Sequence, residues 1–102
     1  MNKKIKVNDP TSNINGTSLI GYVKTTYDNL VEQLGEPEYG WDKSTAHWSV
    51  EASDGTVATI YDWKTDYTPM GEYHWHIGGH YSQKSKALLL VEICTNTIPE
   101  AA

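Results

Sequence analysis

The segment EYHWHIGGH, residues 72–80, contains three of the four histidines of the chain and is the stretch best suited to chemistry. His74 and His76 are two residues apart, so on a strand both side chains would point to one face, about 6–7 Å from each other. That spacing suits a metal ion with nitrogen and oxygen ligands. The further ligands available to such an ion are His80, or His47 together with Asp62. The same spacing fits an ordinary strand whose Trp75 enters the core and whose histidines line the surface or a shallow groove, and we expect this second arrangement.

His47 and Asp62 form a second pair with catalytic chemistry, because a carboxylate beside an imidazole can orient it for acid–base catalysis. Ser49 would share the face of His47, but its surroundings are not those of a nucleophile elbow. Cys94 lies in an apolar run typical of an inert buried thiol. The chain contains no GxxxxGK or GxGxxG phosphate loop, no HExxH motif and no cysteine pair. We therefore expect a protein without enzymatic activity and without a cofactor.

Aromatic side chains near these histidines indicate a role in recognition. Tyr39 and Trp41 follow the first predicted helix, and flat rings with hydrogen-bonding edges can stack a base or accept the hot-spot side chains of a partner protein. The alternative is that both rings fold back over the core. The candidate residues for a binding groove are Tyr39, Trp41, His47, Asp62, His74 and His76.

Charge is unevenly distributed along the chain, whose formal net charge is −5. Residues 1–24 carry four lysines and one aspartate, whereas residues 25–83 carry ten carboxylates and two lysines. Such a field repels nucleic-acid phosphates and attracts a cation or a basic protein surface, although it can also serve only solubility. We expect no direct contact with nucleic acid. The candidate residues for an acidic binding surface are Asp28, Glu32, Glu36, Glu38, Asp42, Asp66 and Glu72.

The size and cysteine content of the chain set its organisation. We expect one domain, residues 1–102, in which the polar segment 1–17 is loosely held. The single cysteine excludes an intramolecular disulfide and favours a reducing compartment. The sequence shows neither a secretory signal nor an apolar run long enough to cross a membrane. These features predict a cytoplasmic protein with no membrane contact. They leave its oligomeric state open, including a homodimer.

Hydrophobic spacing predicts the elements that must position these residues. A helix is expected up to Leu34, capped by Thr25 or Thr26 and ended by Gly35 and Pro37. Strands with alternating side chains are expected at residues 18–23, 46–52, 57–63 and 73–77, with a possible short edge strand at KIKV near the N-terminus. The segment QKSKALLLVEICTN fits a helix capped by Ser82, and it also fits a strand. The fold class expected is α+β, with one antiparallel sheet of about three or four strands and two helices packed on its aromatic face.

The second and third of these strands form a hairpin around Asp54-Gly55. Pairing Ala52 with Val57 would set the register of that hairpin. In this register Trp48 lies opposite Tyr61 on one face, and His47 lies opposite Asp62 on the other. Gly21, inside the first strand, predicts a bend or close packing against a neighbour.

Three strings of the chain resemble motifs of a family of small phage and prophage proteins: NGTSLIGYVKTTYDNLVEQLGEP, AHWSVEASDGTVATIYDWK and WHIGG. The resemblance covers residues 15–80, while segments 1–14 and 81–102 depart from it. It implies host takeover or counter-defence in the host bacterial cytoplasm, and it transfers no catalytic residues. With the acidic charge, it leads us to expect a stoichiometric, anti-CRISPR-like inhibitor that binds a basic surface of a bacterial defence protein. The alternatives are a sponge for a nucleotide messenger and, below both, a metal-dependent hydrolase.

Overall fold

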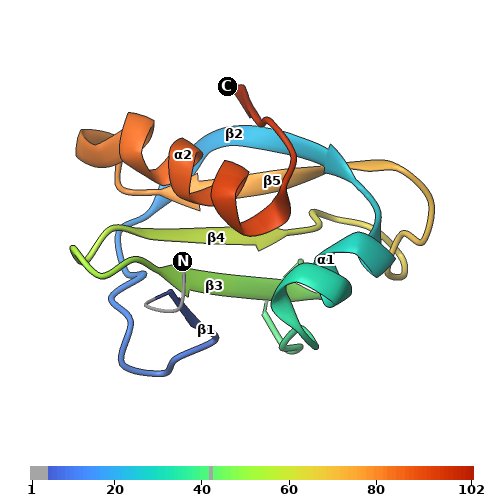
Figure 1. The fold of residues 1–102 in the computed structure, drawn as a ribbon. Helices are drawn as coiled ribbons and strands as arrows, with labels where there is room; N and C mark the ends of the chain where they lie inside the picture. The colour runs from blue at the N-terminus through green and yellow to red at the C-terminus, as the bar shows by residue number, and fades with distance from the viewer. Residues whose placement is uncertain (1–4, 42) are drawn as a thin grey trace.

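Six antiparallel strands form one sheet in the computed structural model, which describes residues 5–41 and 43–102 (Figure 1). The strands lie in the order β1-β3-β4-β5-β2-β6, and two helices cover one face of the sheet. The strands are β1 (Lys6–Val7), β2 (Ser18–Thr25), β3 (His47–Glu51), β4 (Val57–Tyr61), β5 (Tyr73–Gly79) and β6 (Glu100–Ala101). The helices are α1 (Tyr27–Leu34) and α2 (Lys84–Thr95), with a 3₁₀ turn at Tyr81–Gln83 before the second. The expected α+β class is confirmed.

The expected number of three or four strands is wrong, because the sheet continues past both edges. β1 pairs with β3 through Lys6 and Val7, and β6 pairs with β2 through Glu100 and Ala101. β1 lies in the KIKV segment and confirms the short edge strand expected there. β6 has only two residues and therefore no detectable periodicity, so its pairing in the folded chain alone defines it. Gly21 makes room for β6, since a Cβ at this position would lie 2.4 Å from the Glu100 carbonyl oxygen. The close packing expected at this glycine is therefore confirmed.

Helix α1 begins and ends where its sequence predicts. Thr26 is the N-cap, and its side chain accepts a hydrogen bond of 3.1 Å from the backbone N–H of Asn29. Gly35 follows the last turn with φ of +90°, a conformation that favours glycine. The Gly35 N–H donates to the Val31 carbonyl, and Leu30 is the buried residue of the helix. Local sequence is sufficient to specify this element.

The last long element is a helix and not a strand, but it begins later than expected. Ser82 lies in the 3₁₀ turn and does not cap α2, and Gln83 holds the N-cap position without a side-chain hydrogen bond. The physical reason is that the turn, closed by a 2.8 Å bond from the Gln83 N–H to the His80 carbonyl, runs directly into the helix. Asn96 ends α2 in the left-handed conformation. Neither helix of the described residues has the length and apolar content needed to cross a lipid bilayer.

The register of the β3–β4 hairpin differs by one residue from the expected one. Ala52 pairs with Thr56, so the loop has three residues and ends at Gly55 with φ of +90°. A turn that ends in a left-handed glycine is a common three-residue hairpin loop. A shift of one residue exchanges the faces of a strand, so Ile60, and not Tyr61, lies opposite Trp48. Tyr61 therefore moves to the face that carries the histidines.

The helix-covered face of the sheet contains the hydrophobic core. Trp48 and Trp75 are fully buried and pack edge to face, with ring centroids 5.6 Å apart. Further core residues come from the sheet and both helices: Ile20, Val23, Leu30, Val50, Ile60, Ile77, Ala87, Leu90 and Val91. Cys94 is also buried, and burial raises the pKa of its thiol to about 11. This cysteine is a core residue with low reactivity, as its apolar surroundings in the sequence predict.

Candidate functional site

The face of the sheet opposite the helices carries a row of polar aromatic side chains. His47 pairs with Tyr61, Tyr61 with His76, and His76 with Tyr22. Paired residues in an antiparallel sheet share a face, so these four side chains cross β3, β4, β5 and β2 in one line. Two tryptophans from the adjoining loops add further rings. We call these six residues the aromatic cluster: Tyr22, Trp41, His47, Tyr61, Trp63 and His76.

The rings of the aromatic cluster are in direct contact. Trp41 stacks on His47 with centroids 3.5 Å apart and an interplanar angle of 17°. His76 has three ring neighbours, namely Tyr22, Tyr61 and Trp63, at centroid distances of 5.1, 5.5 and 6.4 Å. Trp63 remains 42% exposed, so it is the most accessible tryptophan of the chain. The cluster thus forms a continuous aromatic surface that is partly open to solvent.

Both histidines of the cluster are neutral at physiological pH. His47 is 1% exposed, and burial lowers its pKa to about 4 although the nearby Asp62 carboxylate acts in the opposite direction. Burial also lowers the pKa of His76. The Nδ1 atoms of both rings are buried without a hydrogen-bond partner. The cluster therefore presents uncharged imidazoles between aromatic rings.

Asp62 does not line a groove; it anchors the loops at the end of the hairpin. Its carboxylate accepts hydrogen bonds from the backbone N–H groups of Thr45 and Ala46, at 2.7 and 3.0 Å. The hydroxyls of Ser44, Thr45 and Thr65 donate to the same carboxylate. Burial alone would raise the pKa of this group, but the combined hydrogen bonds lower it below its ordinary value. The expected pairing of Asp62 with His47 across the hairpin is thus replaced by Tyr61 opposite His47.

The remaining groove candidates lie outside the aromatic cluster. Tyr39 is 62% exposed, and its hydroxyl is 3.3 Å from that of Tyr27 on α1. His74 is exposed and pairs with Lys24 across β5 and β2. Of the six predicted groove residues, the structure brings Trp41, His47 and His76 together. The sequence reasoning missed Tyr22, Tyr61 and Trp63, and the correct hairpin register would have revealed Tyr61.

The structure does not assemble the metal ligands considered from the sequence. Across residues 5–41 and 43–102, no group of three or more His, Cys, Asp or Glu side chains is placed to hold a metal ion. His80 is directed elsewhere, since its Nε2 lies 3.1 Å from the Asn13 carbonyl oxygen. His74 and His76 share a face of β5, as the alternation predicts.

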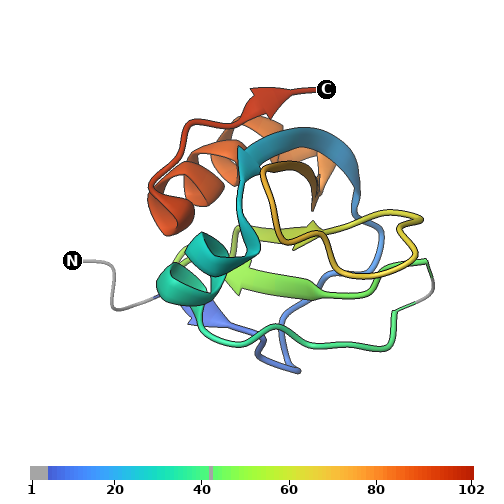
Figure 2. The ribbon, with the colours of Figure 1, turned by 90° about the vertical axis from the view of Figure 1, so that its right-hand side faces the viewer.

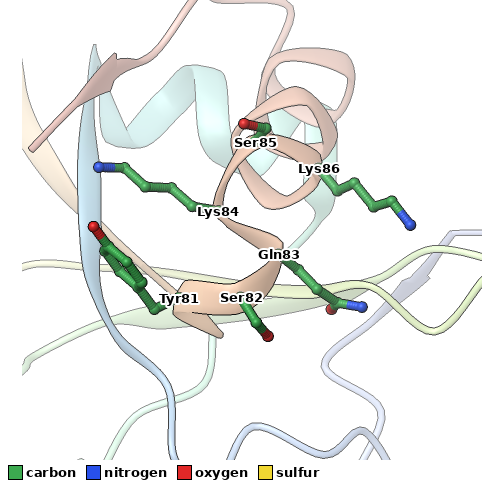
Figure 3. A pocket seen from close by; sticks show the side chains of 6 residues that line it. All are labelled: Tyr81, Ser82, Gln83, Lys84, Ser85 and Lys86. Atoms are coloured by element: carbon green, nitrogen blue, oxygen red, sulfur yellow. The ribbon is translucent and has the colours of Figure 1, made fainter.

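Two cavities of similar size lie at different places on the surface. One, of about 420 Å³, lies beside the aromatic cluster and is lined by Asp9–Asn15, Glu38, Trp41 and Ser49. The other, of about 480 Å³, surrounds the 3₁₀ turn and the start of α2, where Tyr81, Lys84 and Lys86 point outward (Figure 3). The first combines an aromatic ring with carboxylates, whereas the second is flanked by two lysines.

The acidic candidates gather at one end of the molecule. The pairing of the strands places the last residues of β2 and β4 beside the first residues of β3 and β5, so the segments that join these strands lie at the same end of the sheet. The segments joining these strands, residues 26–46 and 62–72, contain eight carboxylates and two lysines. Figure 2 views the molecule from this side, with α1 and both loops toward the reader. We call this region the acidic end. Its exposed carboxylates in the described chain are Asp28, Glu32, Glu36, Glu38, Asp66 and Glu72, and Asp42 lies outside the described residues.

Comparison with protein-family models, with curated proteins and with solved structures finds no match for this chain. Geometry and charge therefore carry the functional argument.

Proposed function

We propose that this protein acts by stoichiometric binding to a partner protein with a basic surface, which it contacts through its acidic end. The observation that carries the proposal is that exposed carboxylates and exposed aromatic rings occur together at this end. Charged groups steer association and set the orientation of a partner, whereas aromatic rings supply most of the contact energy. A surface used only for solubility needs the first group and not the second.

The carboxylates of the acidic end are mostly available to a partner. Glu72 forms an exposed ion pair of 3.7 Å with Lys24, an arrangement that contributes little to stability in water. Glu32 and Asp66 are exposed and come from opposite sides of this end, one from α1 and the other from the loop before β5. A basic surface placed against the acidic end would therefore meet negative charge across its full width.

Three exposed aromatic residues accompany these carboxylates. Tyr39 and Tyr67 are 62% and 80% exposed, and both belong to loops of the acidic end. Trp63 extends the same surface toward the aromatic cluster. Single exposed rings are common on protein surfaces, but several near one another mark an interaction surface, and tyrosine and tryptophan are enriched at the centres of protein interfaces. Their position favours a protein surface as the ligand.

The resemblance to phage and prophage proteins suggests the class of partner. A bacterial defence protein that binds DNA or RNA has a basic groove, and an acidic protein can occupy that groove in place of phosphates. We therefore propose an anti-CRISPR-like inhibitor that competes with nucleic acid for such a groove, without catalysis of its own.

A nucleotide sponge ranks second. Lys64 Nζ lies 5.9 Å from the centre of the Trp63 ring, so one cation is close to a ring that could stack a base. However, the surrounding acidic end repels phosphates, and a nucleotide messenger would have to overcome that field. The sponge becomes the better description if a cyclic nucleotide or an ADP-ribose derivative raises the melting temperature of the protein.

The test uses the purified protein and immobilised CRISPR nucleases, with affinity measured at increasing salt. We expect a complex whose affinity falls at least about tenfold between low and high ionic strength, because screening weakens exposed charge pairs. The variant Glu32→Gln/Asp66→Asn should weaken binding about tenfold, mainly through slower association.

The matched control is Asp54→Asn/Glu100→Gln, which removes the same charge away from the acidic end. The amide introduced by Asp54→Asn keeps a side-chain oxygen that can accept the turn hydrogen bond from the Thr56 N–H. Equal weakening by both variants would show a general charge effect and contradict the acidic-end interface. An affinity that does not change with salt would do the same.

A further inference from the structure

The cavity between residues 9–15 and β3 has walls that are held in place before any ligand arrives. Glu38 and His47 exchange two backbone hydrogen bonds, of 2.8 and 3.0 Å, which fix Glu38 beside the strand. Trp41 lines the cavity and is held by its stacking on His47. The opposite wall is tied down by Ser12, whose hydroxyl donates to Glu51 at 2.6 Å. Pre-organised walls lower the entropic cost of binding.

The chemistry of these walls selects a planar cation. Indole is the aromatic ring that attracts cations most strongly, and Trp41 and Glu38 line the same cavity. The Glu38 side chain is 55% exposed, so it remains accessible to a ligand. Asp9 adds a second carboxylate, whose pKa is lowered by hydrogen bonds from Thr11 and which is therefore ionised. An anion such as phosphate would be repelled by Glu38, and less strongly by Asp9, whose Oδ2 is 4.0 Å from Lys6 Nζ.

The histidine under Trp41 does not oppose a cation. His47 touches the indole from the buried side, and its Nε2 is 3.8 Å from the Glu38 carboxylate. Because the pKa of this imidazole is lowered to about 4, it is neutral at physiological pH and does not neutralise the Glu38 carboxylate. The Glu38 carboxylate therefore keeps its negative charge for a ligand. His47 covers one face of the Trp41 ring, and the rest of the ring borders the cavity.

We propose that this cavity receives an arginine side chain of the basic partner, with the guanidinium against Trp41 and paired with the carboxylate of Glu38. This inference rests on the proposed function, since it names the group through which the partner is recognised. Arginine suits the site better than lysine because its guanidinium is planar, stacks on aromatic rings and donates two parallel hydrogen bonds to one carboxylate. The cavity volume of about 420 Å³ is within the range of ligand pockets.

The test is a titration of the isotope-labelled 102-residue chain, followed by NMR, with a peptide whose only charged side chain is one arginine. We expect saturable shifts of the Trp41 indole N–H and of the backbone of residues 9–15 and 38. The same peptide with lysine in place of arginine should bind at least about fivefold more weakly, because it lacks the fork of donors. Glu38→Gln should weaken arginine binding about tenfold.

Glu36→Gln is the matched control, because Glu36 is exposed, two residues away and outside the cavity. It should leave the affinity for the peptide unchanged. Equal effects of the two variants, or equal binding of the lysine peptide, would overturn the proposal. A second titration uses guanosine, which also presents paired N–H donors on a planar ring. Shifts with guanosine and none with the arginine peptide would overturn the arginine assignment in favour of a nucleoside.

The two proposals fail in different ways. If the arginine peptide binds but the Glu32→Gln/Asp66→Asn variant captures defence proteins normally, the acidic-end interface is wrong and the arginine site stands. If salt and charge variants alter the complex but Glu38→Gln and Glu36→Gln behave alike, the acidic end stands and the arginine site is wrong.

Discussion

The two faces of the sheet use aromatic residues in opposite ways. On the helix-covered face, Trp48 and Trp75 are completely buried among aliphatic side chains from both helices. On the other face, the tryptophans come from loops and remain partly exposed; Trp41 stacks on His47, and the Trp63 ring lies tilted to that of His76 at a centroid distance of 6.4 Å. The first arrangement gains stability by removing apolar area from water, whereas the second leaves ring surface and polar edges available to a ligand. Under the proposed function, stability and recognition are separated between the faces.

Helices cover one face of the sheet and loops flank the other, and the two kinds of segment are stabilised differently. α1 and α2 satisfy their own backbone hydrogen bonds and can therefore lie on an apolar surface. The loops that flank the aromatic cluster have only scattered backbone hydrogen bonds in the described chain, such as the 2.7 Å bond from the Lys64 N–H to the Lys43 carbonyl. They are held by buried polar anchors, of which the Asp62 carboxylate with its donors from Ser44, Thr45, Ala46 and Thr65 is the main one. We call the sheet face that carries the aromatic cluster the open face, and the face covered by α1 and α2 the helix face. The loops on the open face are thus held by specific hydrogen bonds, whereas the helices on the helix face are held by packing.

The largest effect that separates the faces is expected from the tryptophans. Trp75→Ala should lower the free energy of unfolding by about 3–5 kcal/mol, because it removes a fully buried ring from a packed core. Trp63→Ala, on the other face, should cost about 1 kcal/mol or less, since this ring is 42% exposed. Denaturant unfolding of both variants measures the difference. Similar losses would contradict the division between a structural and a recognition face.

Acid should destabilise the protein through the open face. The pKa of His47 is about 4 in the folded chain and about 6.5 when unfolded. Below pH 6.5 the unfolded chain therefore binds a proton that the folded chain does not, and stability falls as the pH is lowered toward 4. From pH 7 to pH 5 this should cost about 2 kcal/mol, with a further loss in the same direction from His76.

Unfolding by urea at several pH values tests this dependence. His47→Gln should flatten the profile between pH 7 and pH 5, because the titrating group is removed. His74→Gln is the matched control, since His74 is exposed on the same strand face as His76. A profile that keeps its slope in His47→Gln would show that another group causes the acid effect.

Gly78 and Gly79 are neighbours on β5 that face opposite sides of the sheet, so substitutions there compare the two faces through a smaller change in stability. A Cβ on Gly79 would meet the core, at 2.7 Å from Ile20 Cδ1 and 3.1 Å from Ala87 Cβ. A Cβ on Gly78 would point to the open face, 2.5 Å from the Thr59 hydroxyl oxygen. Gly79→Ala should cost about 1–3 kcal/mol because the packed core cannot give way. Gly78→Ala should cost at least as much, because Thr59 is only 2% exposed and its β-branched side chain has restricted rotation; thermal unfolding of the two variants would show a reversed order if this explanation is wrong.

Much of the fold could be predicted where local rules apply. The helix caps at Thr26 and Gly35, the glycine turn at Gly55 and the alternation of Trp75 between His74 and His76 all lie within short segments. Each follows from backbone preference or from the period of the strand. The edge strand β6 could not be predicted in this way, because Glu100 and Ala101 become a strand only by pairing with β2.

The candidate site was predictable only in part, and the reason is the register. Trp41, His47 and His76 could be named from their types and positions. Tyr61 was assigned to the wrong face by a shift of one residue, and Asp62 was assigned to a groove for the same reason. The loop length between β3 and β4 decides that shift, and several lengths are compatible with an Asp-Gly pair. Asp62 instead anchors the loops, because the fold places the hydrogen-bond donors of both loops around its carboxylate.

The sequence by itself determined the α+β class, the first helix, the core tryptophans and the acidic character of the segments that join the strands, whereas it left the last long element open between a helix and a strand. These properties depend on composition, on periodicity and on neighbours within a few residues. Tertiary structure alone decided that the carboxylates share one end, that Trp41 covers His47, and that Glu38 and Trp41 line one cavity. Such placements bring together residues far apart in the chain, and they follow from the pairing of strands and the closure of loops, which no local preference specifies.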